Sequence, residues 1–332
     1  MDSLTQIVLG AAVGEVVLGK KVGNKAMLYG AIAGTIPDLD TFASHFVTTV
    51  DALAIHRGFT HSIFFAVLFA PIMGWFISRF EKAANFKDWS WLFFWGFLTH
   101  PLLDAHTTWG TQLFWPLDLR LAYKNIFVID PLYTLPFLIC VLAAMRLPKK
   151  SARRKNLNKW GLILSTTYLG VTLLLKFYTY QQFKSALNHQ EISYTTIETK
   201  PTAFNSLLWT ANVDTENHYL IGHYSIFDTQ PIHFSKYPKN HLLLDPLRQE
   251  PQVQKLIKIT EGWYNIEQKE DYIILNDLRF GLLSLSPQAK NFVFSYTIKK
   301  DKDGAISIEE REKHMRDGKK LIQELICRIQ GN

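Results

Sequence analysis

The chain has 332 residues with 36 Lys and Arg against 29 Asp and Glu, a formal net charge of +7 and a mean hydropathy near zero. Residues 1–180 carry 17 basic against 10 acidic side chains, whereas the remainder carries 19 of each. Because the basic excess lies in the apolar half, it argues against a nucleic-acid-binding surface and indicates membrane topology. Cys140 and Cys327 fall in different halves, so they indicate no disulfide framework.

Six apolar segments occupy the first 180 residues and predict an all-α, multi-pass membrane bundle. Several are shorter than the ~20 residues that a lone spanning helix needs, so we expect tilted or half-buried helices. The first segment lacks the basic start of a cleavable signal peptide, and none is expected. A soluble protein with six core helices is the alternative, but it would not need the ordered loop charges described next. The segments are Leu4–Gly19, Ala26–Pro37, Ser62–Phe80, Trp89–Leu103, Pro131–Leu147 and Trp160–Phe177.

Basic residues alternate between the loops of this bundle. Thirteen Lys and Arg follow the first, third and fifth segments, and only Arg57, Arg120 and Lys124 lie in the opposite loops. Loops rich in Lys and Arg remain on the cytoplasmic side of a membrane. We therefore expect the N-terminus, the 38–61 and 104–130 segments and everything after Phe177 on the outer side.

The periodicity changes beyond about residue 181. The stretches "HYLIGHYSIF" and "DYIILNDLRF" are strand-like and follow polar turns. The stretch "IEEREKHMRDGKKLIQELICRIQ" predicts a closing amphipathic helix, with Met315, Leu321, Ile322, Leu325 and Ile329 on one side. The sequence thus predicts two domains: a membrane-embedded metal-site domain over 1–180, argued below, and a soluble α+β domain on the outer side over 181–332.

Titratable residues gather where three apolar segments reach the outer face. His100 and Asp104 are four apart and share one face of a helix. Asp38 and Asp40 share a side only in an extended backbone, and Pro37 favours leaving the helix there. His56 and His61 suit a pair of ligands of which the first lies in a loop and the second at the start of a helix. The candidate ligands are Asp38, Asp40, His56, His61, His100 and Asp104, with His106 close by.

Imidazole and carboxylate ligands together suit zinc, manganese or iron. More than four candidates make a two-metal site reasonable, and paired ions can generate a hydroxide and stabilise a hydrolytic displacement. Arg57 lies between the candidate ligands and is predicted either to clamp a phosphate oxygen or to face lipid headgroups. Glu15, deep in the first helix, is expected to have a buried hydrogen-bonding role.

Four ordered motifs resemble those of the YdjM-like family of bacterial membrane-bound metal-dependent hydrolases. The motifs are "MDSLTQIVLGAAVGE", "GTIPDLD", "HRGFTHS" and "LTHPLLDAHTTWGTQLFWP", within residues 1–180. The resemblance implies a multi-pass inner-membrane protein, a metal-dependent hydrolase activity, and metal ligation by the six residues named above. Gln6 departs from the family, in which many members have His there, so the number of bound ions can differ.

The leading hypothesis is a membrane-bound metallohydrolase whose site opens at the outer leaflet, with Asp38, Asp40 and Arg57 as catalytic residues. The His-x-x-x-Asp spacing is similar to that of zinc-dependent phospholipases C, which favours a phosphoester or lipid-type substrate beside the bilayer. The aromatic segment from His106 to Phe127 is suited to lie in the interface and admit a headgroup. A metal-binding transporter or sensor is the main alternative, and a membrane anchor is a third. An intramembrane zincin is disfavoured because the sequence has no His-Glu-x-x-His.

Overall fold

The chain forms two compact units, each described by itself. The computed structural model describes residues 1–286, 289–300, 305–312 and 318–331. Unit 1 comprises Met1–Ala43, Ile55–Leu174 and Ala203–Asn205, and unit 2 comprises Ser44–Ala54, Leu175–Thr202 and Ser206–Asn332. The predicted domain boundary at residue 180 lies inside a single long helix that contributes to both units.

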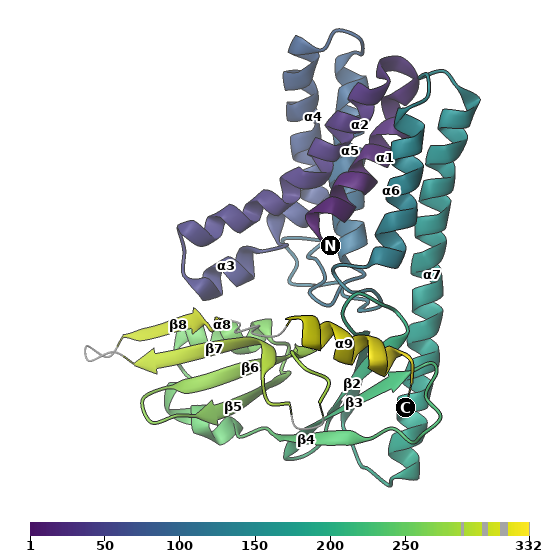
Figure 1. Ribbon diagram of the computed structural model, residues 1–332. Coiled ribbons are helices and arrows are strands. Elements are labelled where there is room, and N and C mark those ends of the chain that lie inside the picture. Colours follow the sequence, from purple (N-terminus) through teal and green to yellow (C-terminus); the bar gives the residue numbers. More distant parts are fainter. Residues whose placement is uncertain (287–288, 301–304, 313–317, 332) are drawn as a thin grey trace. The chain divides into compact units, whose positions relative to one another are not determined.

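Unit 1 is built from helices that correspond to the six apolar segments (Figure 1). Three of them, α1, α4 and α7, are long and apolar enough to cross a membrane, whereas α6 is apolar but shorter. A bundle of about six apolar membrane helices, some of them short, was expected, but α2 has only 12 residues and α5 carries several polar residues, so length and composition support three spans. The helices are α1 (Ser3–Val22), α2 (Asn24–Thr35), α4 (Ile63–Phe80), α5 (Phe86–Asp104), α6 (Pro131–Met145) and α7 (Ala152–His189).

The segment between α2 and α4, expected to be a loop, is largely helical. It contains the 3₁₀ helix η1 (Ile36–His45), the short helix α3 (Thr49–Ile55) and the single turn η2 (Phe59–His61). Ser62 caps α4 by accepting a hydrogen bond from the Phe65 amide. The segment after α5 has little regular structure, and an antiparallel bridge joins Thr111 to Leu121.

Small residues let α1 and α2 approach closely. A Cβ atom added to Gly10 would lie 2.2 Å from the Gly30 carbonyl oxygen, and one added to Gly14 would lie 2.1 Å from that of Ala26. These distances are far below van der Waals contact, so only glycine fits at either position. The close approach of the two helices therefore depends on these glycines.

Ion pairs between charged side chains stabilise one end of the unit 1 bundle, which we call the basic end. Lys21 pairs with Asp88 at 2.7 Å and Lys25 with Glu81 at 2.8 Å. Arg154 binds Glu15 through Nε and Nη2 and also reaches the side chain of Asn24. The pairs bring together the ends of helices whose intervening turns carry most of the basic residues. The buried role expected for Glu15 is confirmed.

Unit 2 contains two four-stranded antiparallel sheets, ordered β1-β2-β3-β4 and β5-β6-β7-β8. The two predicted strand regions form β3 and β6. The sheet-built unit does not match the expected α+β description, because six further strands occupy stretches without clear alternation. The strands are β1 (Thr196–Pro201), β2 (Leu208–Asp214), β3 (His218–Ser225), β4 (Phe234–Pro238), β5 (Tyr264–Gln268), β6 (Ile273–Leu282), β7 (Phe292–Lys300) and β8 (Ile306–Glu310).

Helices in unit 2 are short and cover sheet faces. Phe183 and Leu187, from the final turns of α7, pack in the core of the first sheet. The connection between the sheets includes η3 (His241–Leu247) and α8 (Pro251–Ile259). The predicted closing helix starts later than expected: residues 308–310 end β8, and α9 spans Gly318–Ile329. Met315 lies outside the described residues.

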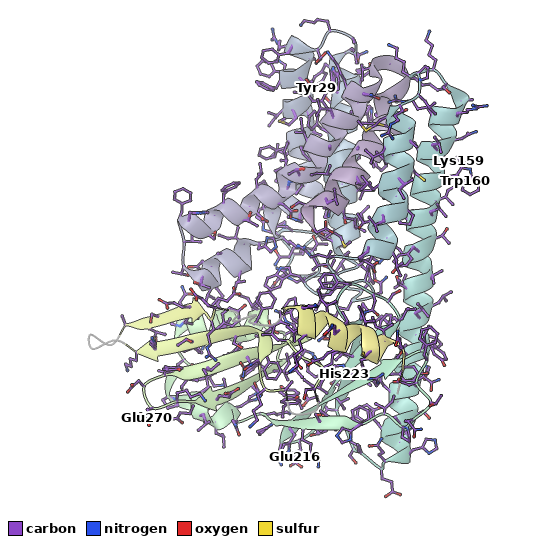
Figure 2. The ribbon with its side chains drawn as sticks, viewed as in Figure 1. Tyr29, Lys159, Trp160, Glu216, His223 and Glu270 are labelled. Carbon is purple, nitrogen blue, oxygen red and sulfur yellow. The ribbon has the colours of Figure 1, made fainter. Side chains whose placement is uncertain are left out.

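One histidine of unit 2, His223, has a structural role. His223 (Figure 2) is buried on β3 and hydrogen-bonds Thr210 at 3.0 Å. Burial, with the nearby charges of Arg328 and Lys200, lowers the pKa of His223 to about 4. It is therefore neutral at physiological pH and is part of the packed sheet.

The buried pair Glu15–Arg154 gives a test of the fold. Their side chains are only 6 % and 2 % exposed, so Arg154→Ala leaves a buried carboxylate without its cation. We expect a loss of about 3–5 kcal/mol in stability, measured by thermal unfolding in detergent. The matched control is Arg153→Ala, because Arg153 is exposed on the same helix turn. A Glu15→Leu/Arg154→Met double variant should recover much of the loss; equal unfolding temperatures for all variants would contradict this account.

Candidate metal centre

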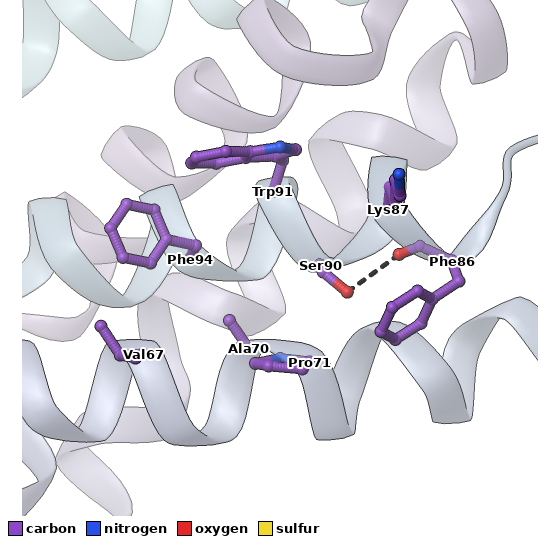
Figure 3. A pocket seen from close by; sticks show the side chains of 8 residues that line it. All are labelled: Val67, Ala70, Pro71, Phe86, Lys87, Ser90, Trp91 and Phe94. Atoms are coloured by element: carbon purple, nitrogen blue, oxygen red, sulfur yellow. Dashed lines mark hydrogen bonds between the residues drawn. The ribbon is translucent and has the colours of Figure 1, made fainter.

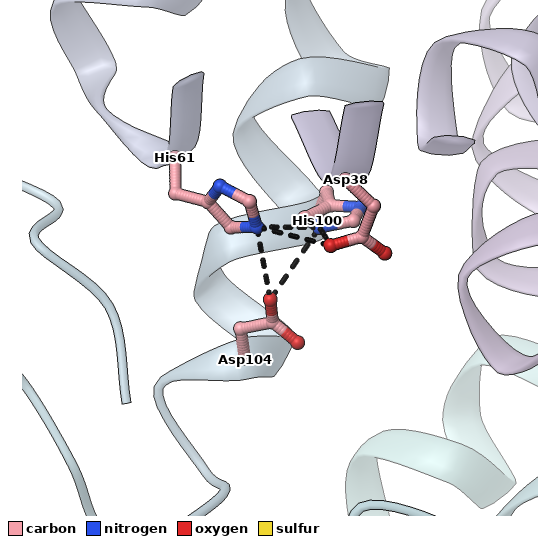
Figure 4. Close-up of side chains that lie close together, drawn as sticks. All are labelled: Asp38, His61, His100 and Asp104. Carbon is pink, nitrogen blue, oxygen red and sulfur yellow. Dashed lines mark hydrogen bonds and ion pairs between the residues drawn. The ribbon is translucent and has the colours of Figure 1, made fainter. Parts of the chain in front are cut away.

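Four of the six predicted ligands meet at the end of unit 1 opposite the basic end. Asp38, His61, His100 and Asp104 each offer one atom, and these atoms all lie within 4.8 Å of one another (Figure 4). The two Nε2 atoms of His61 and His100 are 3.1 Å apart. Each Nε2 also lies 3.3–3.4 Å from Asp38 Oδ1 and from Asp104 Oδ2.

Three chain segments bring these side chains together. His100 and Asp104 occupy one face of α5, as their spacing predicts, and α5 continues through Pro101. Asp38 lies in η1, directly after α2, and His61 ends η2, directly before α4. The close packing of α1 and α2 therefore matters to the site, because it fixes where α2 ends.

The Nδ1 atom of His100 donates a hydrogen bond to the backbone. It lies 2.6 Å from the Gly34 carbonyl oxygen of α2, which can only accept a hydrogen bond. Nδ1 therefore carries the proton, and in a neutral imidazole Nε2 bears a lone pair directed at the cluster. A backbone carbonyl that orients a ligating histidine in this way is a common feature of metal sites.

His61 is also oriented through its Nδ1 atom. Its Nδ1 lies 3.0 Å from Thr60 Oγ1 and 3.4 Å from Asp40 Oδ2. The Thr60 hydroxyl donates its own proton to Asp40 Oδ2 at 3.0 Å, so its oxygen accepts from His61. His61 Nε2 thus bears a second lone pair directed at the cluster.

The four converging atoms suit a metal cation. Two imidazole lone pairs and two carboxylate oxygens, all acceptors, repel one another unless a positive charge lies between them. In a tetrahedral zinc site with bonds of about 2.0–2.2 Å, ligand atoms are about 3.3–3.6 Å apart. The separations of 3.1–3.4 Å observed here are close to this range. Asp104 Oδ2 is buried and accepts no hydrogen bond from the described residues, which fits a ligand atom.

Asp104 is surrounded by donors that the sequence analysis did not identify. Gln6 Nε2 donates to Asp104 Oδ1 at 3.0 Å and to the His100 carbonyl at 3.2 Å, and the Met1 amino group also binds Oδ1. Gln6 lies 98 positions before Asp104, so no local pattern could have indicated the contact. Gln6 is therefore in direct contact with the centre.

Asp40 and His56 form a separate pair beside the cluster. Asp40 Oδ1 accepts from His56 Nδ1 at 3.0 Å, and Asp40 Oδ2 accepts from the Arg57 amide at 2.9 Å. Asp40 is 2 % exposed; burial opposes its ionisation, but the hydrogen bond to His56 holds its pKa below the usual range. The carboxylate therefore stays ionised and fixes the His56 ring.

Asp38 is ionised for a similar reason. Burial again opposes the charge, but where the imidazoles of His100 and His61 are protonated, their hydrogen bonds hold the pKa of Asp38 well below the usual range. Since a carboxylate must be deprotonated to bind a metal, Asp38 is available as a ligand at neutral pH.

Arg57 is buried next to the cluster with a left-handed backbone, φ 58°. Its Nε lies 3.2 Å from Asp104 Oδ2 as an ion pair without hydrogen-bond geometry, and Nη1 donates to Thr107 Oγ1 at 2.8 Å. His106 is not part of the cluster. Its Nδ1 pairs with Asn125 at 2.9 Å, and burial lowers its pKa.

A pocket of about 330 Å³ opens beside the cluster. Its wall includes the polar groups of Asp38, His56 and Arg57 and the apolar side chains of Leu39 and Phe42, which are 50 % and 61 % exposed. The pocket thus joins the charged centre to an apolar, exposed part of η1.

Comparison with known proteins assigns the helical part of the chain to a family. Residues 1–179 match the family described as YdjM inner membrane protein. A stretch of 100 residues is 36 % identical to inner membrane protein YbcI of Escherichia coli (strain K12), covering 30 % of this chain and 57 % of that protein. No solved structure matches the chain. The family match, together with apolar helices long enough to cross a bilayer, shows that the chain belongs to the YdjM inner membrane protein family and is located in the inner membrane.

Proposed function

We propose that this protein is a membrane-bound metal-dependent hydrolase that cleaves a phosphoester with an apolar tail. The observation that carries the proposal is the cluster of four acceptor atoms next to a pocket that is polar at one side and apolar at the other. Asp38, His61, His100 and Asp104 would hold one divalent cation, with zinc the best fit to two imidazoles and two carboxylates. When bound, such a cation supplies Lewis-acid chemistry and acidifies water.

His56 is placed to move the proton of the reaction. Asp40 fixes its Nδ1, and Nε2 makes no hydrogen bond with the described residues, while the side chain lines the pocket. A buried carboxylate behind an imidazole sets its tautomer and stabilises its protonated form. In the proposed reaction Nε2 takes a proton from the attacking water, the phosphorus–oxygen ester bond breaks, and the same proton passes to the leaving oxygen.

Arg57 supplies positive charge at the pocket wall. One edge of its guanidinium faces Asp104 and Thr107, while the residue also lines the pocket. We assign it to the phosphoryl group of the substrate, which keeps the catalytic role expected for it. Leu39 and Phe42 would contact the apolar part of the substrate, consistent with a lipid-type phosphoester.

The transporter alternative receives less support. Transport would require polar groups that continue through the bundle from the metal centre to the basic end. Glu15 is held by Arg154 at the basic end and is part of a structural ion pair. We therefore retain hydrolysis as the proposed function.

We further propose that all six long helices of unit 1 lie in the bilayer, with the basic end inside and the metal centre outside. The basic end carries the positive charges that remain cytoplasmic. By residue 172, α7 has reached the metal-centre side, where Thr172 binds Asn125 at 2.8 Å. The chain would then enter unit 2 on the outer side of the membrane.

Metal content is the first test. Purified protein should carry about one divalent ion per chain, measured by elemental mass spectrometry, and His61→Ala or Asp104→Asn should lose it because each removes one of four ligands. Asp40→Asn should weaken affinity about 10–100-fold, since Asp40 is no ligand but supports His61 through Thr60. The control is His106→Ala, which leaves the cluster intact. Unchanged metal content in the first two variants would disprove the assignment.

Hydrolysis is the second test, with synthetic long-chain and short-chain phosphoesters as substrates. His56→Gln should lower kcat about 10²–10⁴-fold while metal content stays unchanged, because it removes a proton carrier and no ligand. Activity of the wild type should fall below about pH 7, where acidified water is reprotonated. His106→Gln serves as the matched control. If the metal-loaded wild type is as inactive as His56→Gln on every substrate, the enzyme proposal fails.

Orientation is the third test, and the chain offers its own probe. Cys327 is exposed in unit 2, whereas Cys140 is half-buried in α6. In right-side-out membrane vesicles, a membrane-impermeant maleimide should label Cys327 without permeabilisation. Lys150→Cys in a Cys327→Ser background should be labelled only after the vesicles are opened. The reverse pattern would place the metal centre on the cytoplasmic side.

A further inference from the structure

A second concave site lies on the outside of the unit 1 bundle, between α4 and α5 (Figure 3). This groove has a volume of about 280 Å³ and is lined almost wholly by apolar side chains. Val67 and Pro71 of α4 face Phe86 and Trp91 of α5 across it, and the small, buried Ala70 forms its floor. Val67 is 57 % and Trp91 56 % exposed, so the groove is open to the surroundings of the helices.

The geometry of α4 and α5 explains why the groove is hollow. A Cβ atom added to Gly74 would lie 2.2 Å from Ser90 Oγ, so the two helices touch there. Pro71 lacks the amide that would bond the Val67 carbonyl, which weakens the regular packing of α4 one turn away. Small residues on both helices thus leave a groove, and larger side chains surround it.

One charged residue, Lys87, stands at the rim. The two acids nearest to it in sequence are already neutralised: Asp88 by Lys21 at 2.7 Å and Glu81 by Lys25 at 2.8 Å. Among the described residues Lys87 has no acidic partner within ion-pair distance. An apolar groove with one uncompensated cation at its end complements an amphiphile that bears a negative headgroup.

We propose that this groove binds an anionic glycerophospholipid, with an acyl chain along Val67, Ala70 and Trp91 and the phosphate at Lys87. The occupant follows from three features: α4 is long and apolar enough to cross a bilayer, the groove is open, and its charged rim lies at the basic end. A neutral or zwitterionic lipid could fill the groove but would not benefit from the positive charge of Lys87. The site is separate from the metal centre, and the proposal does not depend on the proposed hydrolysis.

The test uses the full-length protein in nanodiscs that contain equal amounts of phosphatidylglycerol and phosphatidylethanolamine. Native mass spectrometry after release measures the ratio of the two lipids retained. A single lysine at an anionic membrane surface contributes about a fivefold preference. The wild type should therefore retain about fivefold more phosphatidylglycerol, and Lys87→Gln should lose that preference while retaining lipid.

Two further variants separate the groove from general surface charge. Lys82→Gln removes a neighbouring lysine whose Nζ already bonds the Ser78 carbonyl, and it should keep the wild-type ratio. Val67→Trp fills the groove from an exposed position and should reduce retention of both lipids; its melting temperature checks that the protein is folded. A wild-type ratio in Lys87→Gln, an equal loss in Lys82→Gln, or full retention in folded Val67→Trp would each overturn the proposal.

Discussion

Hydrogen-bond acceptors and atoms of like charge repel one another in a buried space unless a positive charge holds them together. The end of unit 1 brings two carboxylate oxygens and two imidazole nitrogens together, and both imidazoles have their other nitrogen engaged by an acceptor. This arrangement is the constraint on which our account depends. Arg57 and the Met1 amino group offset the charge of Asp104, but neither lies between the four atoms.

The scaffold supports this arrangement through close backbone packing. The glycines of α1 and α2 let the two helices touch, and α2 then ends where its Gly34 carbonyl meets His100. Gly34 could not carry a side chain, because a Cβ there would lie 2.5 Å from the Gln6 carbonyl oxygen. At the basic end, Arg154 and the lysine pairs fix the other ends of the same helices. The structural ion pairs and the candidate metal centre thus occupy opposite ends of one bundle.

The sequence predicted those features that depend on local spacing or composition. The apolar segments, the shared face of His100 and Asp104, and the strand regions of β3 and β6 follow from patterns a few residues long. The separation of Asp38 from Asp40 could not be predicted, because it depends on η1 being a 3₁₀ helix. With three residues per turn, positions two apart diverge, so Asp38 reaches the cluster while Asp40 reaches His56.

Other features arise only from the tertiary structure. Gln6 meets Asp104 across almost a hundred positions, and the neutralisation of Asp88 and Glu81 by lysines of another hairpin leaves Lys87 unpaired by either acid. The sequence also did not predict the full extent of the sheets in unit 2, because several strands are short and mix polar with apolar residues. Charge patterning therefore indicated which end of the bundle is basic but not which residues pair there.

X-ray absorption spectroscopy of the purified, zinc-loaded protein tests the central claim most directly, because it reports the atoms around the ion. Our account predicts four or five nitrogen and oxygen ligands at about 2.0–2.1 Å, with the multiple-scattering signal of two imidazoles. A shell of six oxygens without imidazole would contradict it, since His61 and His100 would then not be ligands.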